Sequence, residues 1–150
     1  MTVVCSAVIV REGRVLLQQR PIGKDYALKW ENPGGKNEGK ESFHDTIRRE
    51  LREELKIEVV DIREWSLGSW DVFSEAGNKI QIIFWPCGLF RGEPQPQEGQ
   101  GWGWFTIKEM QHLDRTPGNV VAEGAIRQYV EAVTYYENVK REVEGRMEAK

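Results

Sequence analysis

The sequence predicts one mixed α/β (α+β) domain made of layers of strands and helices. The segments from Val3 to Val10 and from Ile80 to Phe90 are apolar and rich in β-branched residues, which is typical of strands. Between Ser42 and Lys56, apolar residues recur at every fourth position, which is helical spacing. The chain has 150 residues, the usual size of one domain with its own hydrophobic core. We therefore expect a single domain over residues 1–150, with its elements in the order strands, helix, strands, helix.

The first elements are expected to form a hairpin. Glu12-Gly13 supplies a turn after the first strand, and the apolar pattern resumes at residues 15–17. Residues 21–37 are expected to be a loop, because Pro33-Gly34-Gly35 interrupts regular structure directly before the helix.

The helix between Ser42 and Lys56 is expected to be amphipathic. Ser42 and Asp45 have the spacing of a capping pair at its start. Its predicted buried stripe consists of Phe43, Ile47, Leu51 and Leu55.

Two further strand regions are predicted at residues 57–70 and 80–90, with Gly77-Asn78 as a turn between them. Pro86 cannot donate a backbone hydrogen bond, so it predicts a bulge or an edge position. Residues 92–103 are rich in Gly, Pro and Gln, which is typical of a surface loop.

The C-terminal part is expected to begin with a short strand at Trp104-Phe105 and to end with a helix that starts near Asn119. From about residue 137 charged residues dominate, which indicates a helical tail whose last turns are solvated or frayed. Val139, Val143 and Met147 keep helical spacing within this tail, so a monomer and a homodimer both stay open.

Composition and charge exclude several classes of protein. The chain has 21 Lys plus Arg against 24 Asp plus Glu, a net charge of −3, so we expect no nucleic-acid polymer as a partner. It has no signal-peptide pattern and no apolar run of about 18 residues, which predicts a cytoplasmic protein without a membrane partner. The two Cys and two His residues lie apart, so neither a disulfide, a zinc site nor a Ser-His triad is expected.

The segment most informative about function is the acidic face of the predicted helix. At about 100° per residue, Glu50, Glu53 and Glu54 lie within an arc of about 100°. One interpretation is a solvated face with ordinary ion pairs, such as Arg49 with Glu53. The other is a metal site, because clustered oxygen ligands without Cys or His favour Mg²⁺ or Mn²⁺, and Mg²⁺ shares its ligand shell with substrate phosphates.

The run from Gly35 to Ile57 resembles the Nudix box, Gly-x5-Glu-x7-Arg-Glu-apolar-x-Glu-Glu-x-Gly-apolar. The matching residues are Gly35, Glu41, Arg49, Glu50, Leu51, Glu53, Glu54 and Ile57. Lys56 stands where the family usually has Gly, so the helix is expected to end differently or to accept modest strain. The likeness extends across most of the chain and is most similar to the MutT branch, whose members are nucleoside triphosphate pyrophosphohydrolases of about this size.

This resemblance implies a Nudix-type α/β/α sandwich with a mixed, partly antiparallel central sheet. It implies a cofactor of Mg²⁺, for which Mn²⁺ is expected to substitute, held by Gly35, Glu50, Glu53, Glu54 and Glu98. Glu98 is alternatively a solvated loop residue. Glu53 or Glu50 is expected to be the general base, and Arg49 to orient these carboxylates. Glu41 is expected to brace the loop before the helix.

The substrate-binding residues implied by the resemblance are Arg20, Gly34, Lys36, Asn119 and Phe84. Arg20 would contact a phosphate, or else be an exposed cation at the end of a strand. Asn119 would bind the base edge, because an amide offers both a donor and an acceptor, or else cap the last helix. Phe84 would stack on a base, although aromatic residues in strands more often belong to the core.

We therefore expect hydrolysis of a nucleoside diphosphate linked to a further group. The favoured substrate is a nucleoside triphosphate, including an oxidised or modified one, that yields the monophosphate and pyrophosphate. Alternatives are a pyrophosphatase for ADP-ribose, nucleotide sugars or dinucleoside polyphosphates, and a non-catalytic module that binds a nucleotide.

Overall fold

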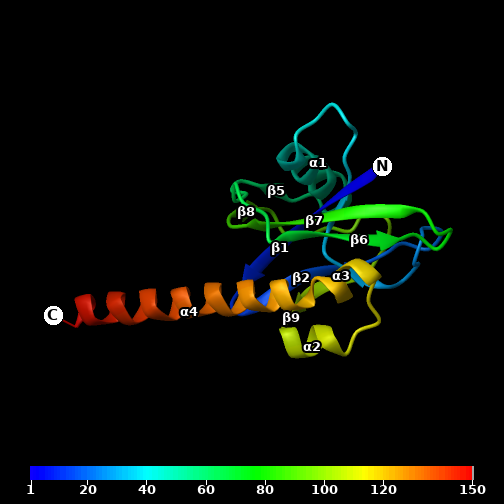
Figure 1. The fold of residues 1–150 in the computed structure, drawn as a ribbon. Coiled ribbons are helices and arrows are strands. Elements are labelled where there is room, and N and C mark those ends of the chain that lie inside the picture. The colour runs from blue at the N-terminus through cyan, green and yellow to red at the C-terminus, as the bar shows by residue number, and fades with distance from the viewer. Residues whose placement is uncertain (150) are drawn as a thin grey trace.

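A mixed seven-stranded sheet runs through the centre of the computed structural model, which describes residues 1–149 (Figure 1). Its strands are β1 (Thr2–Arg11), β2 (Arg14–Gln19), β3 (Trp30–Glu31), β4 (Gly34–Lys36), β6 (Gly68–Phe73), β7 (Lys79–Cys87) and β9 (Trp102–Phe105). The main order is β3-β2-β1-β7-β6, while β4 pairs with β1 and β9 pairs with β2. Strand β1 is parallel to β7 and antiparallel to β2 and β4, so the expected mixed sheet is confirmed.

Helices cover both faces of this sheet, as the α/β/α expectation requires (Figure 1). They are α1 (Phe43–Leu55), α2 (Ile107–Gln111), α3 (Pro117–Val121) and α4 (Glu123–Glu148). A separate two-stranded sheet is formed by β5 (Glu58–Val59) and β8 (Phe90–Arg91).

The two faces of β1 supply two hydrophobic cores, because successive side chains of a strand point to opposite sides. Cys5, Ala7 and Ile9 pack with the buried residues of α1 on one face. Val8 packs with buried residues of α4, including Ile126, on the other. A strand buried on both faces is apolar throughout, which explains the continuous apolar run at the start of the chain.

The predicted β1–β2 hairpin is confirmed, with Val10 opposite Val15. The prediction of a loop over residues 21–37 is wrong in part, because β3 and β4 lie within it. At Gly34 a Cβ atom would lie 2.0 Å from the carbonyl oxygen of Cys5. Gly34 and Gly35 therefore act as residues of a strand, β4, that approaches β1 closely, and they do not interrupt the regular structure.

Helix α1 begins where its capping residue predicts. The Ser42 hydroxyl accepts a hydrogen bond from the Asp45 backbone N–H at 3.1 Å, and Ile47, Leu51 and Leu55 are fully buried. Phe43 is 38% exposed, so its place in the buried stripe was predicted wrongly. As the first residue of the helix it lies at the rim of the core, beside Trp85.

The second half of the chain departs more from the prediction. Within residues 57–70 the chain forms only β5 and the start of β6. Pro86 lies opposite Val8 of β1 in a continuous register, so β7 has no bulge there although it is an inner strand. The missing N–H of Pro86 is tolerated because the pairing of β7 with β6 ends earlier, at Phe84. Strand β9 begins at Trp102, and α2, which was not predicted, is capped by Thr106 and Glu109.

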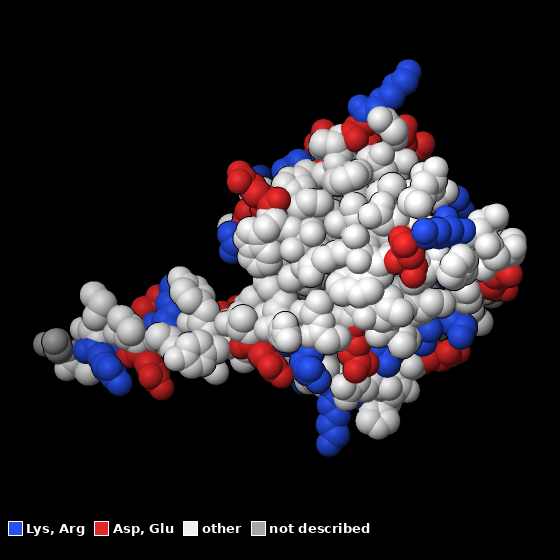
Figure 2. Space-filling model, in the orientation of Figure 1, with Lys and Arg blue, Asp and Glu red and all other residues white. Residues whose placement is uncertain are grey.

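The C-terminal helices begin at Pro117, where the Thr116 side chain caps α3. The alternative role of Asn119 as a helix cap is therefore wrong. Helix α4 continues to Glu148 with its last turns exposed, and Figure 2 shows this end projecting from the body with acidic and basic side chains along it. Within residues 1–149 no helix is both long and apolar enough to cross a membrane.

Helix α1 ends at Lys56, which adopts a left-handed backbone conformation with φ of 57°. A side chain is strained there, and Gly is not. We expect Lys56→Gly to raise the free energy of unfolding by about 0.5–1 kcal/mol, measured by urea denaturation. The control Arg52→Gly, inside the same helix, should lower it by about 1 kcal/mol. An unchanged or lower stability of Lys56→Gly would contradict this account of the helix end.

Candidate active site

The site is built where β4 meets α1, and Gly35 makes this approach possible. A Cβ atom at Gly35 would lie 2.2 Å from the carboxyl carbon of Glu50, so any larger residue would displace the Glu50 carboxyl group from this position. The predicted pair of Gly35 and Glu50 is thus brought together across two elements.

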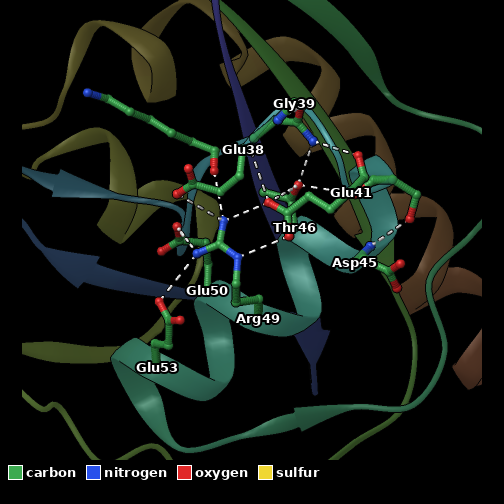
Figure 3. Close-up of polar contacts among 11 residues, drawn as sticks. Glu38, Gly39, Glu41, Asp45, Thr46, Arg49, Glu50 and Glu53 are labelled. Carbon is green, nitrogen blue, oxygen red and sulfur yellow. Dashed lines mark hydrogen bonds and ion pairs between the residues drawn. The ribbon is translucent and has the colours of Figure 1, made fainter.

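Arg49 lies at the centre of the carboxylates (Figure 3). Its guanidinium makes a bidentate pair with Glu41, with N–O distances of 2.7 and 3.0 Å. It also donates to Glu50 at 2.9 Å and to Glu53 at 3.3 Å. A fifth bond, to the backbone oxygen of Lys36 at 2.9 Å, ties the helix to β4. One cation therefore sets the positions of three carboxylates and one strand.

Glu41 holds the loop that precedes α1. Besides pairing with Arg49, its carboxylate accepts the Glu38 N–H at 3.1 Å and the Thr46 hydroxyl at 3.0 Å. The hydrogen bonds from Arg49 lower the pKa of Glu41 to about 2, so it is ionised at neutral pH. These contacts are the ones expected of a bracing residue.

Glu50 and Glu54 differ from a solvated acidic face. Burial raises the pKa of both carboxyls, in the case of Glu54 to about 7. The Gln18 side-chain amide donates to Glu54 at 2.7 Å from strand β2. Arg49–Glu53 and Arg48–Asp45 ion pairs do form, as the simpler interpretation expected. They leave Glu54 desolvated and without an ion pair among the described residues, which an ordinary charged helix face would avoid.

These carboxylates open into a cavity of about 400 Å³, here called the acidic cavity. It brings together Glu50, Glu53 and Glu54 with the loop residue Glu98. A second cavity of about 380 Å³, here called the adjoining cavity, is lined by residues of β1, β6 and β7 and by residues 116–118. The two cavities share Arg20, Glu31, Gly34, Gly35 and Lys36. A ligand with a charged end and a less polar end could therefore occupy both.

The donor set of the acidic cavity fits a hard cation. Within residues 1–149 no three acidic, His or Cys side chains are grouped as a formed metal site, and Arg49 pairs with Glu50 and Glu53. Two observations still favour a cation: the desolvated carboxylates of Glu50 and Glu54, and the buried Gln18 Oε1, which has no hydrogen-bond partner. Oxygen donors of this kind suit Mg²⁺ or Mn²⁺.

Arg20 lies on the boundary between the cavities. Its Nε donates to the Asp25 backbone oxygen at 2.8 Å, and its Nη1 lies 3.5 Å from Glu31. Burial raises the pKa of Glu31 to about 8. Arg20 is therefore tied to the loop that follows β2, and its side chain is 30% exposed rather than fully exposed.

Two predicted substrate residues lie elsewhere than expected. The Phe84 side chain is 1% exposed and packs against Trp70 in the core, so it has no free face on which a base could stack. This corrects its predicted role, because a central strand buries its aromatic residues against the helices. Asn119 is also 1% exposed and does not line the adjoining cavity, although its amide bonds to Asn32, which does.

Three polar residues at the site were missed by sequence reasoning, namely Gln18, Glu31 and Asn32. All three are largely buried, and each lies in or beside a strand. The signal that could have identified Gln18 was its place directly after the apolar residues 15–17 of the predicted second strand. Glu31 and Asn32 were hidden because residues 21–37 were assigned to a loop.

A larger cavity of about 860 Å³ lies between the β1–β2 turn and α4. It shares no residue with the acidic or the adjoining cavity. We place the active site at the two smaller cavities, because the buried carboxylates and the close Gly35 backbone meet there.

Comparison with known proteins assigns the chain to a family. The family model described as the NUDIX domain matches residues 1–128. The CTP pyrophosphohydrolase of Escherichia coli (strain K12) is 36% identical over 120 residues, which are 80% of this chain and 87% of the relative. A putative 8-oxo-dGTP diphosphatase 2 of Mycobacterium tuberculosis is 30% identical over 78% of this chain and 82% of the relative. The crystal structure of a MutT NUDIX hydrolase from Burkholderia pseudomallei superposes with a TM-score of 0.74, at 28% identity, over 83% of this chain and 96% of that structure.

The chain therefore belongs to the NUDIX family. It is a Nudix hydrolase of the MutT-like kind, as the box residues predicted.

The position of Arg49 predicts a stability effect. Arg49→Met would leave the half-buried Glu50 without its cation and remove the bond to the Lys36 backbone, so we expect a loss of about 1–2 kcal/mol in the free energy of unfolding. The control Arg52→Met changes an exposed residue of the same helix and should alter stability by less than about 0.5 kcal/mol. Urea denaturation measures both. Equal effects of the two substitutions would show that Arg49 does not organise the carboxylates.

The raised pKa of Glu54 predicts a pH dependence in the absence of divalent cations. The folded protein holds the Glu54 proton up to about pH 7, whereas the unfolded chain loses it near 4.5, so this residue lowers stability as the pH rises between these values. Glu54→Gln removes the charge, so the variant should match wild type near pH 4.5 and be more stable by about 1–2 kcal/mol at pH 8. Thermal unfolding at both pH values tests this. The exposed Glu58→Gln should show no such divergence from wild type.

Proposed function

We propose that this protein is a Mg²⁺-dependent pyrophosphohydrolase that converts a nucleoside triphosphate into the monophosphate and pyrophosphate. The observation that carries the proposal is the adjacency of an acidic cavity, rimmed by Arg20 and Lys36, and a less polar adjoining cavity of similar volume. The first suits a polyphosphate with its cations, and the second is large enough for a nucleoside. The relatives named as hydrolases of CTP and of 8-oxo-dGTP support this substrate class.

The metal ligands in this proposal are the carboxylates of Glu50, Glu54 and Glu98, with Glu53 and the Gly35 carbonyl as further oxygen donors. When bound, Mg²⁺ would neutralise phosphate charge and make water a better nucleophile. Mn²⁺ offers the same preference for oxygen ligands, so we expect it to substitute.

The protein's own residues position the reactants and move the proton. Arg49 holds Glu50 and Glu53 in place, and Gly35 keeps the backbone against Glu50. Glu53 is 60% exposed at its side chain, so it is accessible to water, and we assign Glu53 or Glu50 as the general base that accepts the proton of the attacking water.

Two cations outside the carboxylate cluster are placed to bind the phosphates. Arg20 and Lys36 line both cavities, so each lies where the phosphate chain would pass from the nucleoside to the acidic cavity. Phosphoryl transfer depends mainly on such positioning and on electrostatic stabilisation.

Glu54→Gln tests the metal assignment. Because it removes one charged ligand from the acidic cavity, we expect kcat/KM with Mg²⁺ to fall about 100-fold or more, measured by pyrophosphate release. The control Glu58→Gln, on an exposed position just after α1, should stay within about 2-fold of wild type. Near wild-type turnover by Glu54→Gln would refute the metal assignment.

A panel of CTP, dGTP, dATP, 8-oxo-dGTP and ADP-ribose, with product detection by chromatography, tests the substrate class. We expect the triphosphates to give monophosphate and pyrophosphate, and ADP-ribose to be cleaved at least about 10-fold less efficiently, because the acidic cavity suits a terminal polyphosphate. Preferential cleavage of ADP-ribose would replace the proposed substrate class, and binding without any product would indicate a non-catalytic module.

A further inference from the structure

Asn32 contributes an unusual group to the adjoining cavity. It lies between β3 and Pro33, is 3% exposed, and lines this cavity. Its side-chain Nδ2 is buried and has no hydrogen-bond partner among the described residues. A buried donor without a partner is costly, because it has lost its bonds to water and gained none in exchange. Such a group is expected where a ligand supplies the missing acceptor.

A chain of hydrogen bonds holds the other end of this amide. Asn119 Nδ2 donates to Asn32 Oδ1 at 2.8 Å. Arg115 Nη1 in turn donates to Asn119 Oδ1 at 3.1 Å and pairs with Glu123 at 2.8 Å. This series of hydrogen bonds thus runs from the carboxylate of Glu123 through the side chains of Arg115, Asn119 and Asn32 to the wall of the adjoining cavity.

Arg115 sets the direction of every hydrogen bond in this series. A guanidinium has only donors, so the Asn119 atom that faces it must be the oxygen. The Asn119 nitrogen then faces Asn32, and the Asn32 atom that meets it must be the acceptor oxygen. Asn32 is left with its N–H₂ group for the cavity. The assignment of nitrogen and oxygen in both amides therefore follows from the fact that the guanidinium can only donate.

The backbone around this chain is held by the sheet. Trp30 N–H donates to the Asp114 oxygen at 2.8 Å, and Thr116 N–H donates to the Trp30 oxygen at 3.0 Å. Residues 114–116 are thus tied to β3, and Asn119 Nδ2 makes a further contact with Met110 Sδ at 3.6 Å. The Asn119 amide cannot turn without breaking bonds at both of its ends, and the Asn32 amide cannot turn without losing its bond to Asn119.

We propose that Asn32 reads the base of the substrate by donating a hydrogen bond from Nδ2 to a carbonyl oxygen at the base edge, with Asn119 and Arg115 as positioning residues. The inference rests on the proposed function, because it takes the ligand of the adjoining cavity to be a nucleoside. It names the substrate class more closely: nucleotides whose base carries a carbonyl group, such as cytosine or guanine, are preferred over adenine, which has none.

The direction of these hydrogen bonds explains why adenine is the disfavoured base. A carbonyl oxygen accepts a hydrogen bond over a broad range of directions, whereas adenine offers ring nitrogens beside an N6 amino donor. At the N6 edge of adenine, Asn32 Nδ2 would meet the N6 amino donor beside each ring acceptor, N1 and N7, which is a poorer match than a carbonyl oxygen. The buried donor therefore favours bases that carry a carbonyl group.

Asn32→Asp tests the direct role, because it replaces the donor by an acceptor of nearly the same shape. The measurements are kcat/KM for CTP and dGTP, and for ribose 5-triphosphate, which has no base. We expect the ratio of nucleoside to base-free substrate to fall about 10–100-fold in Asn32→Asp. Asn138→Asp adds the same charge at an exposed residue of α4 outside both the acidic and the adjoining cavity, and it should leave this ratio unchanged. An unchanged ratio in Asn32→Asp, or an equal fall in Asn138→Asp, would overturn the proposal.

Arg115 variants test the positioning role. Arg115→Lys keeps a donor toward Asn119, so it should retain the preference for CTP and dGTP over dATP. Arg115→Met removes the donor and frees both amides to turn, so the preference should drop to within about 3-fold while kcat for ribose 5-triphosphate is unchanged. A loss confined to overall activity or thermal stability, with the base preference intact, would mean that Arg115 is merely structural.

A binding measurement separates this inference from the proposed reaction. If wild type hydrolyses no triphosphate, the proposed function fails, and base reading is then judged from calorimetry with CMP, GMP and AMP. We expect CMP and GMP to bind at least about 10-fold more tightly than AMP and to shift the Asn32 side-chain amide signals in ¹⁵N NMR spectra of the wild-type protein. Equal affinities, or no shift of those signals on saturation, would overturn the role of Asn32 whether or not the enzyme is active.

Discussion

The ion-pair cluster around Arg49 is the interaction on which the site depends. One guanidinium pairs with carboxylates from the loop before α1 and from the helix itself, and it also bonds to the backbone of β4. Without this cation the acidic side chains of α1 would repel one another at i,i+3 and i,i+4 spacing. Arg49 thus allows a helix to carry a dense acidic face and to present it toward the sheet.

The sheet determines what lies opposite that face. Strand β1 is buried on both sides and carries α1 on one face and α4 on the other. The cavities form near the place where β4 pairs with β1, with α1 residues lining the acidic cavity and the start of α3 lining the adjoining cavity. Gly34 and Gly35 make the distances short enough, because any Cβ atom there would collide with Cys5 or Glu50. The acidic and adjoining cavities are therefore joined through the same few backbone atoms, which links recognition of phosphate to recognition of the base.

Sequence reasoning succeeded where a residue's role depends on its near neighbours in the chain. The capping of α1 by Ser42, the buried Ile47 and Leu51, and the acidic arc of the helix all follow from spacing. It failed where a role depends on distant segments. Phe84 was predicted to stack on a base but lies in the hydrophobic core, where Trp70 and other core residues pack around it.

The sequence by itself determined the family, the mixed α/β class and the box residues that supply the carboxylates, because a helical period and a 23-residue motif are local properties of the chain. Only the tertiary structure decided how the base side of the site is built. Asn32 and Asn119 are 87 residues apart, and neither amide has a direction until Arg115 is packed behind them. Hydrogen-bond polarity across such a distance depends on which partners folding brings together, and no periodicity in the sequence encodes that information.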